Sequence, residues 1–114
     1  MSEGCIFCRI AKGEIPADKI FEDEHFVAFK DIKPIAPAHI LIVPKEHIPT
    51  LNDLGSDKAT MAGDLLATAR EVAKKAGVAE SGYRTVINCN SDAGQEVFHL
   101  HVHVIGGKRL GGMG

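Results

Sequence analysis

Three histidines alternate with apolar residues in the run HLHVHVI, which occupies residues 99–105 of the 114-residue chain. Alternate side chains of a strand share a face, so the histidines would face one way and Leu100, Val102 and Val104 the other, into a core. Neighbouring histidines would lie about 6.6 Å apart at the backbone and the outer two about 13 Å apart. One zinc ion, with bonds of about 2 Å, cannot readily bind all three histidines, although two neighbours could share a metal. Different roles for the three histidines are the favoured interpretation.

Imidazole can also react without a metal. Its pKa of about 6.5 leaves the neutral, nucleophilic form dominant at neutral pH. Attack on phosphorus gives a reactive phosphoramidate that water can hydrolyse, and a second histidine can hydrogen-bond the phosphoryl oxygens or the leaving group. The preceding segment 93–97 can turn backbone N–H groups toward an anion, and Gly94 would permit close approach. The pattern therefore favours chemistry at phosphorus over a three-histidine metal site or a strand with incidental polar residues.

Cys5 and Cys8 have the C-x-x-C spacing, which alone is ambiguous. A thioredoxin-like redox pair needs a βαβ context that the pattern of elements lacks. A zinc site needs two further ligands. The candidates for these ligands are His25, His39, His47 and His99. Cys89 has no partner in either interpretation and is expected to be a small buried apolar residue.

Length and composition are those of one ordinary globular domain over residues 1–114, with 45% hydrophobic and 25% charged residues. The net charge is −2, so the chain lacks the excess of basic residues that is typical of a nucleic-acid binder. Pro34, Pro37 and Pro44 break the longest apolar stretches, so no membrane span is expected. The N-terminus has no apolar signal-peptide core, and three cysteines argue against a disulfide framework, so a cytoplasmic location is expected.

Periodicity and turn residues predict five strands and two helices. A short helix is expected over 5–13, and strands over 19–22, 26–31, 39–44, 83–88 and 98–105. The long helix is expected over 56–76, with Ser56 as N-cap and Gly77 as the C-terminal stop. The segments 33–37 and 91–95 read as loops, and the tail 108–114 is Gly-rich. Short connections between most strands favour an antiparallel sheet and an α+β fold.

The run at residues 99–105 resembles the signature of the histidine triad (HIT) family of nucleotide hydrolases and transferases. Segments 29–32, 36–44, 82–84 and 94–97 fall in the order and spacing of its Hint-type branch. Gly106 and Gly107 also match that branch, whereas Fhit-type dinucleoside polyphosphate hydrolases typically lack this pair. The resemblance implies a five-stranded antiparallel sheet with helices, and a homodimer that joins two sheets.

The resemblance also implies roles for the polar residues. His101 would be the nucleophile, which forms a nucleotidyl-histidine at the α-phosphorus of a purine nucleotide. His103 would bind the phosphate, and His39 would lie behind the nucleophile and support its orientation. Asp31 would bind the ribose hydroxyls, with Ile32 beside it.

The remaining implied contacts involve apolar residues and a phosphate loop. The wall of the base pocket would consist of Ile6, Phe7, Ile10 and Phe29, although plain core is the alternative interpretation of these residues. The phosphate site would be completed by Asn88, Gly94, Gln95, Glu96 and Val97. Glu96 departs from the family, because well-known eukaryotic Hint-type members carry a serine there that is thought to help the leaving group. Only the backbone N–H of Glu96 is therefore expected to contribute to the phosphate site, and the leaving-group preference stays open.

For the C-x-x-C pair, the resemblance selects the partners. Zinc-bearing bacterial HIT proteins and the related galactose-1-phosphate uridylyltransferases use C-x-x-C, a histidine after the Pro-containing strand, and the first triad histidine. In this chain the zinc ligands would be Cys5, Cys8, His47 and His99. Three of the four lie outside the chemistry, so this zinc would be structural.

The sequence thus predicts a purine nucleoside phosphoramidase that cleaves P–N bonds in adenosine phosphoramidates, and related adenylates. A dinucleoside polyphosphate hydrolase is the alternative in the same class. A zinc-stabilised nucleotide-binding interaction module is the alternative in another class. The apolar stripe of the 56–76 helix is wider than one small sheet face requires, which adds to the expectation of a homodimer.

Overall fold

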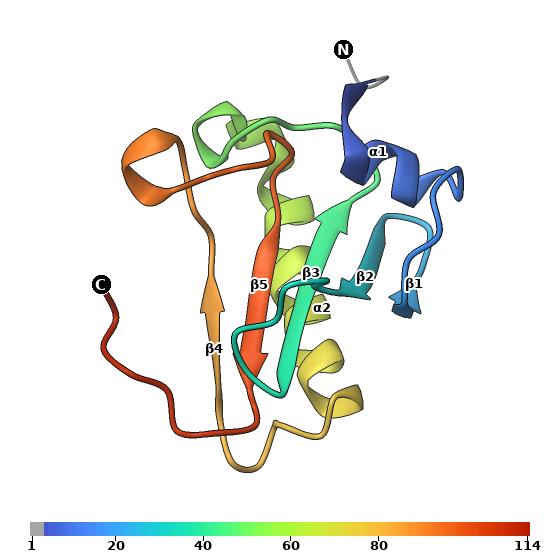
Figure 1. Ribbon diagram of the computed structural model, residues 1–114. Coiled ribbons are helices and arrows are strands. Elements are labelled where there is room, and N and C mark those ends of the chain that lie inside the picture. The colour runs from blue at the N-terminus through green and yellow to red at the C-terminus, as the bar shows by residue number, and fades with distance from the viewer. Residues whose placement is uncertain (1–3) are drawn as a thin grey trace.

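The computed structural model describes residues 4–114 and has five strands in one antiparallel sheet, with a long helix against one face (Figure 1). The sheet order is β1-β2-β3-β5-β4, which confirms the predicted α+β fold with a five-stranded antiparallel sheet, one long helix and a short N-terminal helix. The strands are β1 Lys19–Glu22, β2 Phe26–Lys30, β3 Ala38–Pro44, β4 Tyr83–Val86 and β5 Val102–Gly106. The helices are α1 Ile6–Ala11 and α2 Ala59–Lys75, with 3-10 turns η2 Leu51–Asp53, η3 Ser56–Lys58 and η4 Ser91–Ala93.

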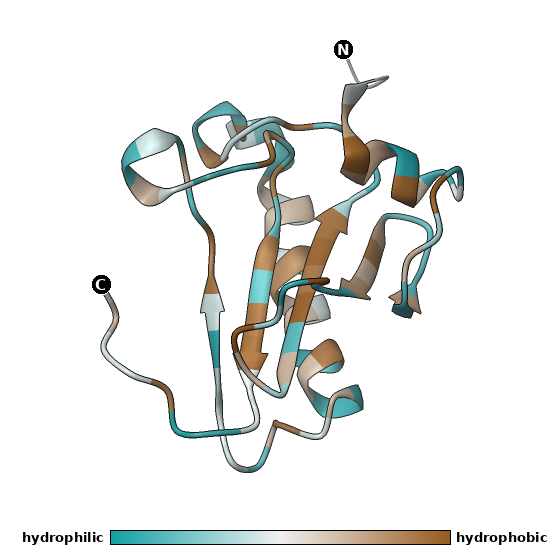
Figure 2. Ribbon diagram, viewed as in Figure 1, coloured by the Kyte–Doolittle hydropathy of each residue, from teal (hydrophilic) through white to brown (hydrophobic). Residues whose placement is uncertain are grey.

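Both faces of the sheet are covered, because β2 and β3 carry apolar residues on both sides (Figure 2). The face toward α2 holds the larger cluster, in which Ile40, Ile42 and Val104 pack against Leu65 and Val72 of the helix. The opposite face packs against α1, and this second buried cluster consists of Phe7, Ile10, Val27, Phe29, Leu41 and Val43. The alternation of β3 between these two clusters explains its unbroken apolar sequence.

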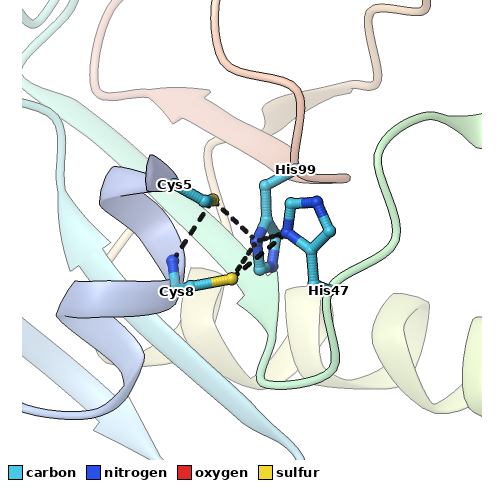
Figure 3. A group of neighbouring side chains, drawn as sticks. All are labelled: Cys5, Cys8, His47 and His99. Carbon is cyan, nitrogen blue, oxygen red and sulfur yellow. Dashed lines mark hydrogen bonds between the residues drawn. The ribbon is translucent and has the colours of Figure 1, made fainter. Parts of the chain in front are cut away.

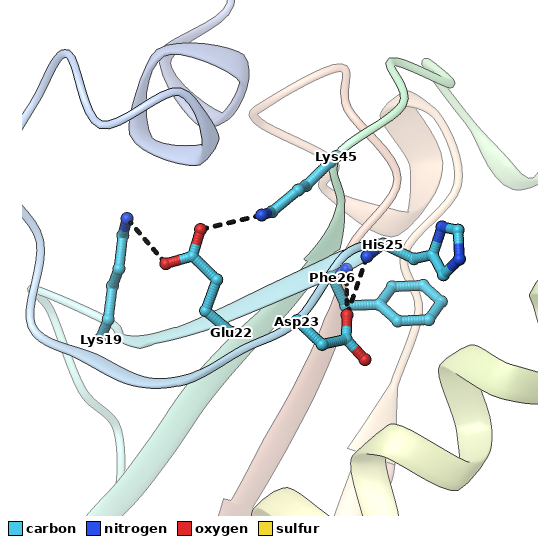
Figure 4. A network of polar contacts seen from close by, with 6 residues as sticks. All are labelled: Lys19, Glu22, Asp23, His25, Phe26 and Lys45. Carbon is cyan, nitrogen blue, oxygen red and sulfur yellow. Dashed lines mark hydrogen bonds and ion pairs between the residues drawn. The ribbon is translucent and has the colours of Figure 1, made fainter.

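The β1–β2 hairpin is closed by side-chain hydrogen bonds in its turn (Figure 4). The Asp23 carboxylate accepts hydrogen bonds of 2.8 Å from the backbone amides of His25 and Phe26. Glu22 lies between two lysines, 3.3 Å from Lys19 Nζ and 2.9 Å from Lys45 Nζ. The Lys45 contact ties the hairpin to the end of β3, so the edge of the sheet is held next to the segment that leads to His47.

Several element ends differ from the sequence prediction; the short helix α1, for example, spans Ile6–Ala11 rather than 5–13. Residues 56–58 form a 3-10 turn, so α2 begins at Ala59 rather than at Ser56, and Ser56 is not its N-cap. The predicted strand 26–31 ends at Lys30, because the Asp31 carboxylate turns back to accept from the Lys33 amide at 2.8 Å. The strand predicted over 83–88 ends at Val86.

The largest difference concerns β5, which begins at Val102 and not at residue 98. Ladder pairing with β3 stops at Ile42 and Val102. Before that point the chain pairs elsewhere, because the Leu100 amide donates to the Ile48 carbonyl at 2.6 Å. His99 and His101 therefore precede the regular strand. Within residues 4–114, no helix combines the length and apolar character needed to cross a membrane.

Candidate active site

The triad alternates as the sequence predicts, although only its last member lies in the regular strand. Leu100, Val102 and Val104 all belong to the cluster beneath α2. On the other side the rings of His101 and His103 lie 5.1 Å apart between centroids. His39, which the sequence also selected, comes from β3, and its ring lies 5.1 Å from that of His103. The three catalytic candidates therefore meet on the α1 face of the sheet.

A chain of hydrogen bonds determines which nitrogen of His103 carries a proton. The Ile35 backbone amide donates to His39 Nδ1 at 3.1 Å, so the proton of neutral His39 is on Nε2. This Nε2–H donates to His103 Nδ1 at 2.9 Å, which places the His103 proton on its own Nε2. Asp31 Oδ2 lies 3.4 Å from His39 Nε2. His39 was expected behind the nucleophile, but its hydrogen bond is to His103 instead of His101.

His101 has the opposite tautomer. Its Nδ1–H donates to the His99 carbonyl at 2.7 Å, and because a carbonyl can only accept, Nε2 keeps the lone pair. The His101 ring also packs edge-on against Phe7, with 5.1 Å between centroids and 85° between planes. Two contacts thus hold the orientation of a ring whose exposed fraction is only 7%. The arrangement presents one nucleophilic nitrogen and, on His103, one donor N–H.

Burial keeps these imidazoles neutral. Desolvation lowers the pKa of His39 and of His101 below the ordinary value, although the Asp31 charge opposes the shift at His39 and the His99 carbonyl opposes it at His101. Desolvation, with the nearby His101 and His39, lowers the pKa of His103 to about 4. All three rings are therefore uncharged at neutral pH, which the nucleophilic and donor roles require.

The expected wall of the base pocket is divided in the structure. Phe7, Ile10 and Phe29 are buried together, with the rings of Phe7 and Phe29 in edge contact at 5.5 Å. Ile6 and Ile32 have exposed fractions of 46% and 92%. The three buried residues thus belong to the core beneath the triad, whereas the two isoleucines are free to meet a ligand.

The loop before the triad offers backbone donors. Gly94 has φ of 76°, a left-handed conformation that suits glycine, and it ends the turn η4. Within residues 4–114, neither the Glu96 nor the Val97 backbone amide donates a hydrogen bond. Asn88 is half-buried, and Glu96 is exposed. Gln95 is different, since its side chain is buried and both of its N–H donors are used within the protein.

Four potential metal ligands converge beside the triad from three parts of the chain (Figure 3). Cys5 and Cys8 belong to the α1 segment, His47 follows β3, and His99 precedes β5. His99 Nδ1 lies 3.2 Å from Cys5 Sγ, 3.3 Å from Cys8 Sγ and 3.2 Å from His47 Nδ1. In a tetrahedral zinc site, sulfur and nitrogen ligands would be about 3.6 Å apart and two nitrogens about 3.3 Å. The resemblance to the HIT family implied these four ligands, and the structure brings them together at nearly that spacing.

The protonation of the histidines separates this cluster from a second one. His99 Nε2–H donates to the Pro44 carbonyl at 2.7 Å, which leaves the inward-facing Nδ1 with a free lone pair for a metal. Asp31, His39 and His103 also lie close enough to share an ion. There, however, the Ile35 amide occupies His39 Nδ1, so Nε2 carries the proton and cannot ligate. The chemistry of the donor atoms therefore fits a metal at the Cys2His2 cluster and not at the second cluster.

The Cys8 thiol of this cluster is protonated at neutral pH when no metal is bound. Burial raises the pKa of the Cys8 thiol to about 11, and the neighbouring Cys5 contributes to the shift. The Cys8 sulfur lies 3.2 Å from His47 Nδ1. Metal binding must therefore displace a proton from Cys8.

The sheet and the histidines that it positions are those of a HIT domain, and the HIT domain family matches residues 12–110. This chain belongs to the HIT family. It is 44% identical over 113 residues to the purine nucleoside phosphoramidase of Escherichia coli (strain K12), an alignment that covers 99% of this chain and 95% of the relative.

Solved structures agree with the family assignment. The fold is similar to a HIT family hydrolase from Legionella pneumophila Philadelphia 1, with a TM-score of 0.91, 49% identity and coverage of 93% of this chain and 95% of that one. It is also similar to a HIT family hydrolase from Clostridium thermocellum, with a TM-score of 0.93, 46% identity and coverage of 97% and 96%.

Proposed function

We propose that this protein is a nucleotide hydrolase that cleaves purine nucleoside 5′-phosphoramidates and related adenylates at the α-phosphorus. The observation that carries the proposal is the tautomer of His101, whose Nδ1–H is bound to the His99 carbonyl and whose Nε2 keeps its lone pair. The similarity to a purine nucleoside phosphoramidase along nearly the whole chain supports the same substrate class.

The proposed reaction has two steps. His101 Nε2 attacks the α-phosphorus, a bond between phosphorus and Nε2 forms, and the bond to the leaving amine breaks as the amine takes a proton from solvent. Water then attacks the phosphorus of the nucleotidyl-histidine. The bond to Nε2 breaks as the attacking water releases a proton to solvent, the nucleoside monophosphate leaves, and neutral His101 is restored.

The neighbouring polar groups stabilise the phosphoryl oxygens in this proposal. His103 Nε2–H donates to one oxygen, and His39 keeps that proton in place through its bond to His103 Nδ1. The free backbone amides of Glu96 and Val97 donate to the phosphate, with Asn88 nearby. Donors that are already oriented need no rearrangement as negative charge develops.

The nucleoside would lie beside this group. Asp31 binds the ribose hydroxyls through its carboxylate, which is half-buried next to His39. The exposed Ile6 and Ile32 contact the base directly, and Phe7, Ile10 and Phe29 support that surface from the core. Aliphatic contacts do not distinguish adenine from guanine, so the proposal covers purines as a class.

The Cys2His2 cluster would hold zinc in a structural role. Thiolate and imidazole ligands in this number are typical of structural zinc. Bound there, the ion would supply no chemistry to the reaction, and it would anchor the short α1 segment to the residue before β5. The contact of Phe7 with His101 supports this role, because Phe7 lies between Cys5 and Cys8.

We also propose that the active form is a homodimer built through α2 and β4. β4 is an edge strand of the sheet, and Tyr83 on it is 36% exposed. Leu66 on α2 is 57% exposed and faces away from the buried stripe of the helix. An exposed leucine on the helix and an edge strand with one side unpaired are features that suit a second copy of the chain.

The decisive comparison is steady-state turnover of an adenosine 5′-phosphoramidate against diadenosine tetraphosphate. Faster cleavage of the phosphoramidate supports the proposal. Faster cleavage of the tetraphosphate would indicate a dinucleoside polyphosphate hydrolase. Turnover of neither substrate, with AMP still bound, would indicate a nucleotide-binding interaction module.

A further inference from the structure

Both polar atoms of the Gln95 side-chain amide are hydrogen-bonded inside the protein. Its Oε1 accepts from the Asn90 backbone amide at 2.8 Å. Its Nε2 donates to the Pro49 carbonyl at 2.9 Å and to the Val97 carbonyl at 3.0 Å. An amide group has only two N–H donors, and both are used. With 7% of its surface exposed, Gln95 cannot donate to a ligand without breaking one of these bonds.

One of these bonds holds a strained residue. Asn90 has φ of 68° and ψ of −173°, a conformation that L-residues rarely adopt. Its carbonyl accepts from the Gln95 backbone amide at 3.1 Å and from the Ala93 amide at 3.3 Å. Gln95 therefore binds both polar groups of the Asn90 backbone and closes the loop 90–95 on itself. Strain of this kind persists only where the surroundings impose it.

The other two bonds connect this loop to the segments that carry metal ligands. Pro49 lies two residues after His47, and Val97 lies two residues before His99. Next to them the Leu100 amide donates to the Ile48 carbonyl at 2.6 Å. One side chain thus joins the loop, the segment after β3 and the segment before β5.

From these contacts we infer that Gln95 is a positioning residue. It holds the loop 90–97 in the shape in which the free amides of Glu96 and Val97 face an anionic group, and its own side chain does not touch the substrate. The inference rests on the proposed function only in taking that group to be a nucleotide phosphate. Because oriented donors bind an anion without reorganisation, loosening the loop should weaken phosphate binding and spare nucleoside binding.

The first test needs no ligand. Gln95→Met keeps the length of the side chain and removes all three side-chain hydrogen bonds. The amides of residues 94 and 95, which donate to the Ser91 and Asn90 carbonyls, should exchange with solvent at least about tenfold faster than in the wild type. Asp92→Asn, an exposed change in the same turn, is the matched control and should leave both exchange rates unchanged.

The second test separates positioning from a contact with the substrate. In Gln95→Met the affinity for AMP should fall about tenfold, the equivalent of one good hydrogen bond, while the affinity for adenosine changes less than about twofold. Unchanged exchange with weaker AMP binding would overturn the inference in favour of a direct contact. Equal weakening of AMP and adenosine would reduce Gln95 to general support of the fold. If the wild type binds no AMP, the proposed function fails, and the exchange measurement alone then decides whether Gln95 holds the loop.

Discussion

Replacing Cys8 with serine should lower thermal stability by releasing the metal from the cluster of Cys5, Cys8, His47 and His99. Cys8 is 3% exposed, and its sulfur lies within 3.3 Å of the facing nitrogens of both histidines. Serine is a poor zinc ligand by comparison with a thiolate, so the variant should bind zinc far more weakly. Cys89→Ser is the matched control, because Cys89 is half-buried and lies outside the cluster.

The size of the effect follows from linkage between binding and folding. At a free zinc concentration about 1,000 times Kd, binding stabilises the folded state by about 4 kcal/mol. For 114 residues the entropy of unfolding is about 0.24 kcal/mol per kelvin near the melting temperature. The wild type should therefore melt about 17 °C higher with zinc than after chelation, and Cys8→Ser should show almost none of this difference.

The pH dependence of zinc binding tests the same mechanism independently, because the stabilisation should decrease as the pH falls. The raised pKa of the Cys8 thiol, about 11, means that zinc must displace its proton throughout the neutral range. Each pH unit of acidification thus weakens binding at least about tenfold, so from pH 8 to pH 6 about 2.7 kcal/mol of the stabilisation is lost. Scanning calorimetry with and without chelator, beside elemental analysis, measures both effects. Wild-type protein that is purified without chelator, contains no metal and melts at an unchanged temperature with added zinc would refute the reasoning.

Three further predictions concern the triad and the assembly. The NMR titration of His103 should have its midpoint near pH 4, because burial lowers its pKa from the ordinary value of 6.5; its contribution to stability is then complete above pH 6.5 and lost as the pH falls toward 4, and a midpoint near 6.5 would contradict the packing. His39→Ala removes the donor that orients His103 and should reduce kcat about 100-fold with a smaller effect on AMP affinity, whereas equal losses in both would show that His39 acts in binding. Light scattering at micromolar concentration should give twice the mass of one chain, and Leu66→Asp should shift it toward the monomer; a wild-type monomer would remove the dimer proposal.

The sequence predicted the sheet well, because β3 and β5 carry strong patterns. The unbroken run of Ile40 to Val43 indicated a strand buried on both faces, and the structure confirms it. The start of β5 was predicted wrongly for a reason that no pattern reveals. The Leu100 amide donates to the Ile48 carbonyl instead of continuing the ladder, and His101 donates to the carbonyl of His99, so the chain before Val102 is not in the sheet.

The partners of the site residues were harder to predict than the residues themselves. The spacing of the histidines indicated a shared face, but it could not show that His39 orients His103, since this depends on the Ile35 amide in a loop. Gln95 was predicted to bind substrate, and only the structure reveals that its amide is bound within the protein. Backbone carbonyls and amides have no signature in the sequence, so contacts to them appear only after folding.

The most direct test of the central claim is kcat of His101→Ala on an adenosine 5′-phosphoramidate, measured beside His25→Ala. His25 is exposed and distant in sequence from the triad, so its replacement controls for the loss of an imidazole. If His101 Nε2 forms the bond to phosphorus, kcat of His101→Ala should fall by about 10³-fold or more while AMP still binds, and His25→Ala should keep the wild-type rate. A His101→Ala protein that keeps more than about 5% of the wild-type kcat would contradict the account, because turnover at that level leaves no room for an essential nucleophile.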